Sequence, residues 1–139
     1  MVLLNYIVRL KQVTDIKNLQ KEIMNNLNKY SKILAEDVQK AQKETVTTLK
    51  DQVKTDSPKR LGDYETGWRI KKEDKKLILY NKTDYQLTHL LEHGHAKKNG
   101  GRVAAQVHIR PAEQTAVKSY LQKIEQAIKQ WTWNNWKQF

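Results

Sequence analysis

Apolar residues recur every three or four positions from about Asp15 to Lys54, and this spacing places them on one face of an α-helix. The stripe consists of Ile16, Leu19, Ile23, Leu27, Tyr30, Leu34, Val38 and Ala41. Thr14 or Asp15 can cap the first turn of this helix. Pro58 disfavours helical geometry at the residue before it, so the helix should end in the segment DSPKR.

This helix is long for a chain of 139 residues. At 1.5 Å per residue it spans about 60 Å, whereas a compact domain of this size has a radius of gyration near ~14 Å. The rest of the chain cannot cover it along its whole length. Two arrangements are open. The helix kinks at the β-branched segment TVTT, or part of its stripe packs on another subunit, which we favour.

The pattern after Pro58 changes from helical spacing to turn residues and short apolar runs. Ser57, Pro58, Gly62 and Asp63 form a linker rich in turn formers. The segments TGWRIKK and KLILYN then predict two strands joined at Glu73 and Asp74. We expect an antiparallel hairpin here.

A short helix is predicted next, in the segment NKTDYQLTHLLEHG. Thr83 and Gln86 have the spacing of a capping box, and Gly94 is a typical stop signal. The residues on the apolar face of this helix are Tyr85, Leu87, Leu90 and Leu91.

The last part of the chain predicts a strand and a helix. AAQVHI favours a strand, and Pro111 is suited to the first position of a helix. Its inward-facing residues should be Val117, Tyr120, Leu121, Ile124, Ile128 and Trp131. The N-terminal VLLNYIVRL is strand-like but ambiguous. The predicted fold is α+β in one domain, residues 1–139, with a long N-terminal helix, a small antiparallel β-sheet, a short helix, a long basic loop and a C-terminal helix.

Charge and cysteine content narrow the classes of function. The 26 Lys and Arg against 15 Asp and Glu give a net charge of +11, which favours contact with polyanions or acidic protein surfaces. The chain has no cysteine, which excludes a disulfide framework, a thiolate zinc site and a cysteine nucleophile. Its early apolar run is too short to span a bilayer or to act as a secretory signal, so we expect a soluble intracellular protein without membrane contact.

The stretch from Leu90 to Gln114 contains three of the four histidines and three of the five glycines. His89, His93, His95 and His108 could ligate a metal, but Leu90 follows His89 where a hydrolytic zinc helix has glutamate. Hydrogen-bonded or solvated histidines are therefore favoured over a metal site. No serine lies in a nucleophile-elbow pattern, so no catalytic residues are predicted.

The segment KKNGGR allows two further interpretations. Gly100 and Gly101 expose backbone amides that can hold an anion, next to the positive charges of Lys97, Lys98 and Arg102. Neither a Walker pattern nor a dinucleotide fingerprint is present. Gly94 to Arg110 is a long loop for a compact domain, and such loops are often functional or ordered only when bound.

The segment from residue 131 to 139 is rich in aromatics near the chain terminus. Trp131, Trp133, Trp136 and Phe139 need a surface to pack on, either the core or a partner. Interleaved aromatics and lysines can also stack on nucleic-acid bases, although only Lys129 and Lys137 lie nearby. Core packing and docking on a partner both stay open.

The ordered motifs resemble a known family. SPKRLGDYETGWRIKK followed by LILYNKTDYQLTHLLEHGHAKKNGGRVAAQVHIRPAEQ is similar to the neck or head-tail joining proteins of long-tailed phages and prophages of Gram-positive bacteria. Their members are often labelled minor capsid or tail-component proteins. The resemblance covers roughly Ser57 to Ile128. Leu61 stands where threonine is usual, and Val107 where proline is common.

The resemblance implies a structural virion protein without catalytic residues, metal or other cofactor. It implies a ring, with a hexamer as one candidate, at the head-tail junction through which DNA passes. Partners would be further copies and the adjoining head-completion and tail proteins, with assembly in the host cytoplasm. The expected ring-contact loop comprises His95, Lys97, Lys98, Gly100, Gly101, Arg102, His108 and Arg110. Two rival functions remain: a basic DNA-binding module and a metal-dependent enzyme.

Overall fold

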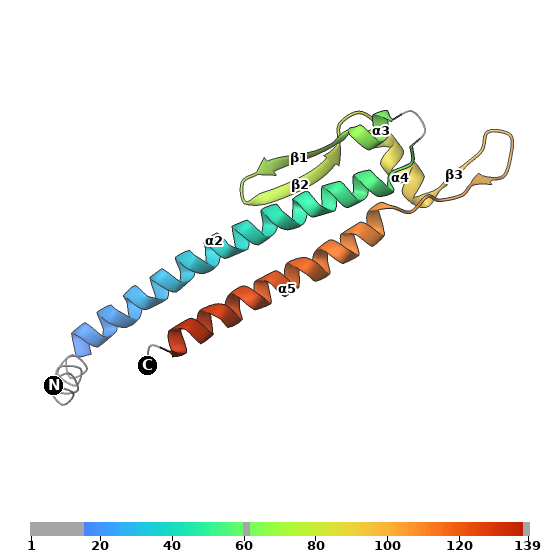
Figure 1. Cartoon of the computed structure of the whole chain (residues 1–139). Helices are drawn as coiled ribbons and strands as arrows, with labels where there is room; N and C mark the ends of the chain where they lie inside the picture. Colours follow the sequence, from blue (N-terminus) through green and yellow to red (C-terminus); the bar gives the residue numbers. More distant parts are fainter. Residues whose placement is uncertain (1–15, 60–61, 138–139) are drawn as a thin grey trace. The chain divides into compact units, whose positions relative to one another are not determined.

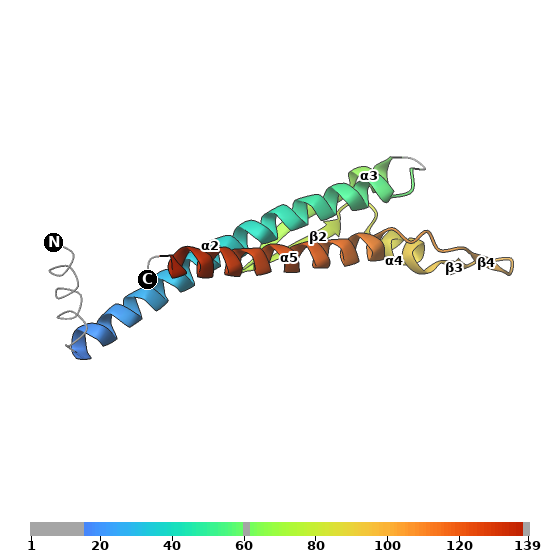
Figure 2. The ribbon, with the colours of Figure 1, turned by 60° about the horizontal axis from the view of Figure 1, so that its bottom comes forward.

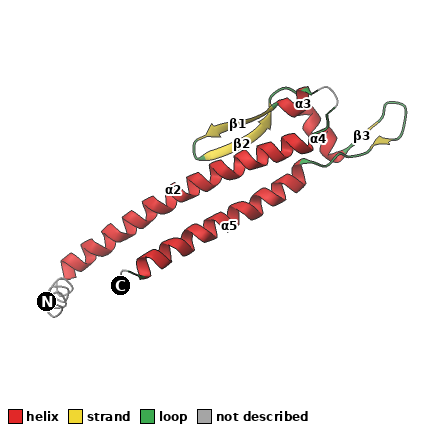
Figure 3. Cartoon of the chain, viewed as in Figure 1, coloured by secondary structure: helices red, strands yellow, loops and turns green. Residues whose placement is uncertain are grey.

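A computed structural model describes residues 16–59 and 62–137 (Figure 1). The chain divides into two compact units, Met1–Asp37 and Val38–Phe139, each of which is described by itself. The elements are α2 (Ile16–Asp56), α3 (Asp63–Thr66), β1 (Trp68–Glu73), β2 (Lys76–Asn81), α4 (Tyr85–His93), β3 (His95–Ala96), β4 (Arg102–Val103) and α5 (Ile109–Trp136). Helices dominate and the strands form only two-stranded ladders (Figure 3), which confirms the predicted α+β class.

Helix α2 confirms the long N-terminal helix predicted from the apolar spacing. It continues without interruption through the segment TVTT, where the hydroxyls of Thr47 and Thr48 donate to the carbonyls four residues earlier. It ends at Asp56, one residue before Ser57, whose hydroxyl donates to the carbonyl of Val53 at 2.6 Å. The proposed caps Thr14 and Asp15 lie outside the described residues.

The part of α2 in the first unit leaves its apolar stripe open. Leu19, Ile23, Met24 and Leu27 are between 38% and 55% exposed. The periodicity correctly predicted which residues share a face of the helix. Within residues 16–59 and 62–137, that face is left largely open.

The predicted hairpin is confirmed. β1 and β2 are antiparallel, with Trp68 opposite Asn81 and Glu73 opposite Lys76. The turn places Asp74 at a φ of 51°, a left-handed conformation that aspartate tolerates better than most residues. The linker before the hairpin contains a one-turn helix, α3, which was not predicted, and Thr66 belongs to it and not to the strand.

Helix α4 confirms the predicted short helix and its stop at Gly94. The predicted capping box is wrong, because the N-cap residue is Asp84 and no side chain caps the helix. The hydroxyl of Thr83 instead donates to the carbonyl of Asp63 at 2.9 Å. Of the predicted apolar face, only Leu91 packs against the core, whereas Tyr85, Leu87 and Leu90 are exposed.

The predicted strand AAQVHI is wrong. The ladder in this region joins His95 with Val103 and Ala96 with Arg102, and the chain then runs on extended without a strand partner. The amide of Gln106 donates a hydrogen bond to the carbonyl of Leu91 at 2.7 Å, which links this segment to the end of α4. Helix α5 begins at Ile109, so Pro111 lies in its first turn and not at its first position.

The core of the second unit forms where α2, the hairpin, α4 and α5 meet. Its buried residues are Val53, Tyr64, Trp68 and Ala112, with Leu49, Leu79, Leu91 and Ile109 packed around them. Further along, α5 lies beside α2 (Figures 1 and 2), where Lys123 and Glu44 form an ion pair at 3.0 Å.

The predicted inward face of α5 is partly wrong for the single chain. Val117, Leu121 and Ile128 are exposed, whereas Tyr120, Ile124 and Trp131 are half-buried. The helix turns Ile109 and the small Ala112 toward the core, and Val117, Leu121 and Ile128 lie outside that face.

Candidate functional site

A buried hydrogen-bond network lies at the base of the basic loop and begins with His108, which is 2% exposed. Its Nδ1 lies 2.7 Å from the carbonyl oxygen of Gln106, and because a carbonyl only accepts, Nδ1 is the donor. Its Nε2 is hydrogen-bonded to the Tyr64 hydroxyl at 2.8 Å. His108 is thus a hydrogen-bonded core histidine. Although its sequence position placed it in the predicted contact loop, its side chain is not on the surface.

Two aromatic rings pack against this histidine. Tyr64 and Trp68 meet the His108 ring edge-on, with centroids 5.6 Å and 6.4 Å away. The Trp68 indole N–H donates to the hydroxyl of Ser57 at 3.0 Å, which links the hairpin to the end of α2. Burial, reinforced by the negative charges of Glu92 and Asp84, raises the pKa of Tyr64 to about 12. The phenol therefore stays protonated and keeps donating at neutral pH.

Glu92, on α4, fixes the start of α5. Its carboxylate accepts the backbone N–H groups of His108 and Ile109 at 3.1 Å and of Arg110 at 2.9 Å. These are amides that a helix N-terminus leaves without partners, and the negative charge also suits the helix dipole. Burial raises the pKa of Glu92, but the three N–H donors outweigh it and the pKa lies below its ordinary value.

A second cluster of hydrogen bonds holds the same end of the hairpin, where Asn81 lies opposite Trp68. The Asn81 amide donates to the carbonyl of Tyr64 at 2.8 Å, and its oxygen accepts the N–H groups of Thr83 and Asp84. Gly67 packs directly on this cluster, so an added Cβ would lie 2.1 Å from the Thr83 hydroxyl and 2.5 Å from the Asn81 oxygen. The motifs TGW and YNKTD are therefore two halves of one structural joint.

The basic loop projects from the end of α4 as a narrow finger made of β3, β4 and the turn between them (Figures 1 and 2). The Lys97 amide donates to the carbonyl of Gly101, and the Gly100 amide donates to the carbonyl of Lys97. Gly100 and Gly101 have φ values of 91° and 82°, which side chains disfavour. At the base, Gly94 is needed for space, since an added Cβ would lie 2.5 Å from the Val103 carbonyl oxygen.

The structure brings most of the predicted contact residues together on this finger. The exposed ones are His95, Lys97, Lys98, Gly100, Gly101 and Arg102. Arg110 is exposed too, but it lies on the first turn of α5 and not on the finger. The arrangement offers a positively charged tip to a partner.

The histidines do not converge on one site. His89 and His93 lie one turn apart on α4 with ring centroids 4.7 Å apart. Among the residues that the structure describes, no group of three or more His, Cys, Asp or Glu side chains is placed to hold a metal ion.

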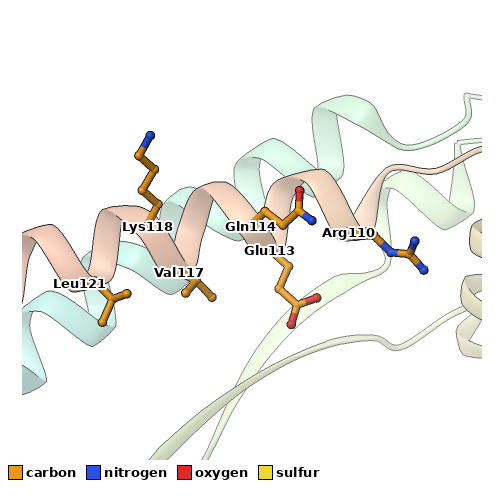
Figure 4. Close-up of a pocket in the computed structure, with 6 residues that line it drawn as sticks. All are labelled: Arg110, Glu113, Gln114, Val117, Lys118 and Leu121. Atoms are coloured by element: carbon orange, nitrogen blue, oxygen red, sulfur yellow. The ribbon is translucent and has the colours of Figure 1, made fainter.

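A groove on α5 was not expected from the sequence. It has a volume of about 500 Å³ and is lined by Arg110, Glu113, Gln114, Val117, Lys118 and Leu121 (Figure 4). Val117 and Leu121, 52% and 61% exposed, form its apolar part. The sequence did contain a signal for this groove, namely the apolar row with Val117 and Leu121, but the sequence analysis assigned that row to the core.

The aromatic tail continues α5 to Trp136. Trp133 and Trp136 are 60% and 76% exposed, and the Lys137 ammonium lies 4.9 Å from the Trp133 ring centroid. Phe139 lies outside the described residues. Trp133 and Trp136 therefore do not pack in the core of the single chain.

None of the helices in residues 16–59 and 62–137 combines the length and apolarity that a membrane span requires. The described residues form a buried hydrogen-bond network around His108, a positively charged finger and a helix with an exposed apolar groove. Those are the features of a protein that assembles with other proteins.

The family assignment agrees with this class. Residues 21–94, more than half of the chain, match the family described as "Bacteriophage HK97-gp10, putative tail-component". The chain belongs to this family of phage structural proteins, which confirms the resemblance seen in its motifs and places the protein in the virion. No curated protein and no solved structure matches the chain significantly. The match ends at Gly94, so the finger and α5 lie beyond it.

Proposed function

We propose that this protein is a joining subunit of the phage head-tail junction, where copies of the whole chain assemble as a closed ring around the path of the DNA. The observation that carries the proposal is the exposed apolar surface of α5 in a member of a phage tail-component family. Large apolar side chains left in water are unfavourable, and extended exposed patches mark protein interfaces.

The two ends of α5 support different contacts in such an assembly. Near its start lies the apolar groove, and near its end Trp133 and Trp136 are exposed. Tryptophan is strongly enriched at the centres of protein interfaces. A subunit with contact surfaces at two places can bind neighbours on two sides, which a ring requires.

The finger supports contact with adjoining virion proteins or with passing DNA. Its turn carries Lys97, Lys98 and Arg102 but no acidic residue between them, in a chain with a net charge of +11. A positive surface near the DNA path would attract phosphates without reading sequence. Below the finger, Tyr64, Glu92 and His108 are engaged in hydrogen bonds that hold its base.

Electron microscopy of phage particles tests the location. We expect a tag on this protein to appear only between head and tail, and particles assembled without it to separate into filled heads and free tails. Label along the tail tube or at the distal tip would contradict the proposal.

The solution mass tests the ring. Light scattering on the full chain should show higher-order species, and removal of the residues after Lys129, which include the exposed tryptophans, should shift the distribution to monomer. An unchanged distribution after truncation would remove the tail from the proposed contacts.

Hydrogen exchange tests the role of the finger. Amides of Gly94 to Arg110 should exchange faster in the free protein than in assembled particles, because an interface would shield them. Equal protection in both states would contradict a contact through this loop.

DNA binding is the second candidate function, favoured by the positive finger. If it were the main role, the affinity for duplex DNA should fall steeply with salt, and Lys97→Gln should reduce the slope by about one ion. A flat salt response would exclude it.

A further inference from the structure

The stripe of α2 runs through both units of the chain but has different surroundings in each. Positions eleven residues apart lie on one side of a helix, because eleven residues make almost exactly three turns at 3.6 residues per turn. The sets related in this way are Leu19, Tyr30 and Ala41; Ile23, Leu34 and Thr45; and Leu27, Val38 and Leu49. The stripe is therefore one continuous feature of α2.

The C-terminal part of this stripe is an established helix contact. Ala41 and Thr45 are buried, and Leu49 packs against a core that includes Ala112 of α5. The ion pair between Glu44 and Lys123 joins the same two helices. The stripe of α2 thus meets α5 in the core around Leu49 and Ala112 and at this ion pair.

Helix α5 has a second apolar row that its own chain covers only at Ile124, which is half-buried. Val117, Leu121, Ile124 and Ile128 follow one another at intervals of four, three and four residues, the spacing of a coiled-coil seam. Val117, Leu121 and Ile128 are exposed, and the first two form the apolar part of the groove in Figure 4.

We propose that the exposed N-terminal stripe of α2, formed by Leu19, Ile23 and Leu27, packs into the α5 seam of a second copy of this chain. The argument is continuity, since the same stripe of α2 reaches α5 within the chain at Leu49, in the core that includes Ala112. Each copy has one open stripe and one open seam. Two different surfaces that complement each other form a heterologous contact, which can repeat around a closed ring.

The contact is small, and its size favours a ring over a pair. Stable pairwise interfaces use roughly 20–30 residues on each side, and each of these rows exposes only a few large apolar side chains. A single contact is weak, whereas closure of a ring gives every copy two contacts at once and raises the effective concentration of each. The inference thus rests on the proposed ring and names the surfaces that close it.

Disulfide cross-linking tests the pairing directly, because the chain has no native cysteine. Full-length Ile23→Cys and Leu121→Cys are prepared separately and mixed under mild oxidation. We expect a disulfide-linked heterodimer in the mixture and much less linkage in either variant alone. Lys21→Cys, also exposed but about 160° around the helix from Ile23, is the matched control and should not link to Leu121→Cys.

A second variant tests the energetics. Leu121→Ser removes an exposed side chain and should leave the monomer folded, but it should raise the protein concentration needed for assembly roughly tenfold or more. Gln122→Ser, exposed on the neighbouring face, should assemble like the wild type.

The outcomes separate this inference from the proposed function. Rings that form without the mixed cross-link, or Leu121→Cys linking mainly to itself, would overturn the stripe-to-seam pairing and leave the ring intact. No assembly of the wild type at any concentration, with no cross-link, would overturn both.

Discussion

The two halves of α2 carry the same apolar periodicity, yet one is covered and the other is not. Between Val38 and Asp56 the stripe meets the hairpin and α5, and Val53 is completely buried. Between Ile16 and Asp37, Leu19, Ile23 and Leu27 remain exposed. A periodic pattern thus specifies which face of a helix is apolar, but not whether that face is covered by the same chain or by another copy.

A similar contrast separates the buried hydrogen-bond network around His108 from the exposed surfaces of α5 that we propose for assembly. Tyr64, Trp68, Glu92 and His108 are hydrogen-bonded to one another, to the Ser57 hydroxyl or to backbone across several elements, so a change there should affect folding. Side chains on the α5 seam and the tail have few contacts within the chain, so a change there should affect association. Matched substitutions in the two regions test this difference.

The largest effect is expected at Trp68, compared with Trp133. Trp68→Ala removes a buried ring and its hydrogen bond to Ser57, and should lower the free energy of unfolding by about 3–5 kcal/mol. Trp133→Ala, at a 60% exposed position, should change it by less than ~0.5 kcal/mol. Urea titration followed by circular dichroism measures both. Similar losses in the two variants would mean that the tail belongs to the core.

Gly67 comes next, compared with Gly100. Gly67 has an ordinary φ of −75°, so the cost of Gly67→Ala comes from the clash with Thr83 and Asn81 and should be about 2 kcal/mol. Gly100→Ala meets no neighbouring atom, and only its φ of 91° opposes it, at about 1 kcal/mol. The loss in free energy of unfolding of each variant is obtained from the shift of its denaturant midpoint. A smaller loss at Gly67 than at Gly100 would show that the joint can open without cost.

Glu92 should matter less than the glycine clash but has a distinct pH signature. Glu92→Gln weakens the three hydrogen bonds to the α5 amides and should cost about 1–2 kcal/mol at neutral pH. The pKa of Glu92 is lowered in the folded state, so its contribution is present above the ordinary value of 4.5 and is lost as pH falls through the lower folded value. The difference between variant and wild type should therefore shrink in acid.

The exposed Glu113 is the control for Glu92. Glu113→Gln should change stability by less than ~0.5 kcal/mol and leave its pH dependence as in the wild type. A Glu92→Gln variant whose deficit grows toward low pH would contradict the capping role.

The smallest effect is expected for the ion pair between Glu44 and Lys123. Their side chains are 49% and 32% exposed, so water screens the attraction. A double-mutant cycle of Glu44→Ala and Lys123→Ala should give a coupling of about 0.5 kcal/mol that declines with salt. A coupling above ~2 kcal/mol would mean that α2 and α5 are held mainly by charge.

Sequence patterns predicted the elements built from local repetition. The stripe of α2, the hairpin and the stop at Gly94 are confirmed, because helix and strand periods and glycine preferences act over a few residues. The motifs around Trp68 and Asn81 also correctly indicated the family.

Errors arose where distant residues meet. Thr83 and Gln86 have capping-box spacing, but the Thr83 hydroxyl bonds to Asp63, twenty positions earlier. The start of α5 depends on Glu92, a carboxylate sixteen residues upstream of His108. No local window contains both partners. The exposed α5 groove was missed because both apolar rows of that helix have helical spacing, and spacing does not say which row the chain covers.

The amino-acid sequence alone determined the helical stripe, the hairpin, the positive loop and the membership in a phage tail-component family, since these depend on neighbouring residues or on motif order. Only the tertiary structure decided that His108 is a core residue, that Glu92 caps α5, and that Val117 and Leu121 face water. The reason is that burial depends on which surfaces meet in three dimensions, and a face that fits two partners equally well is assigned only when one of them is in place.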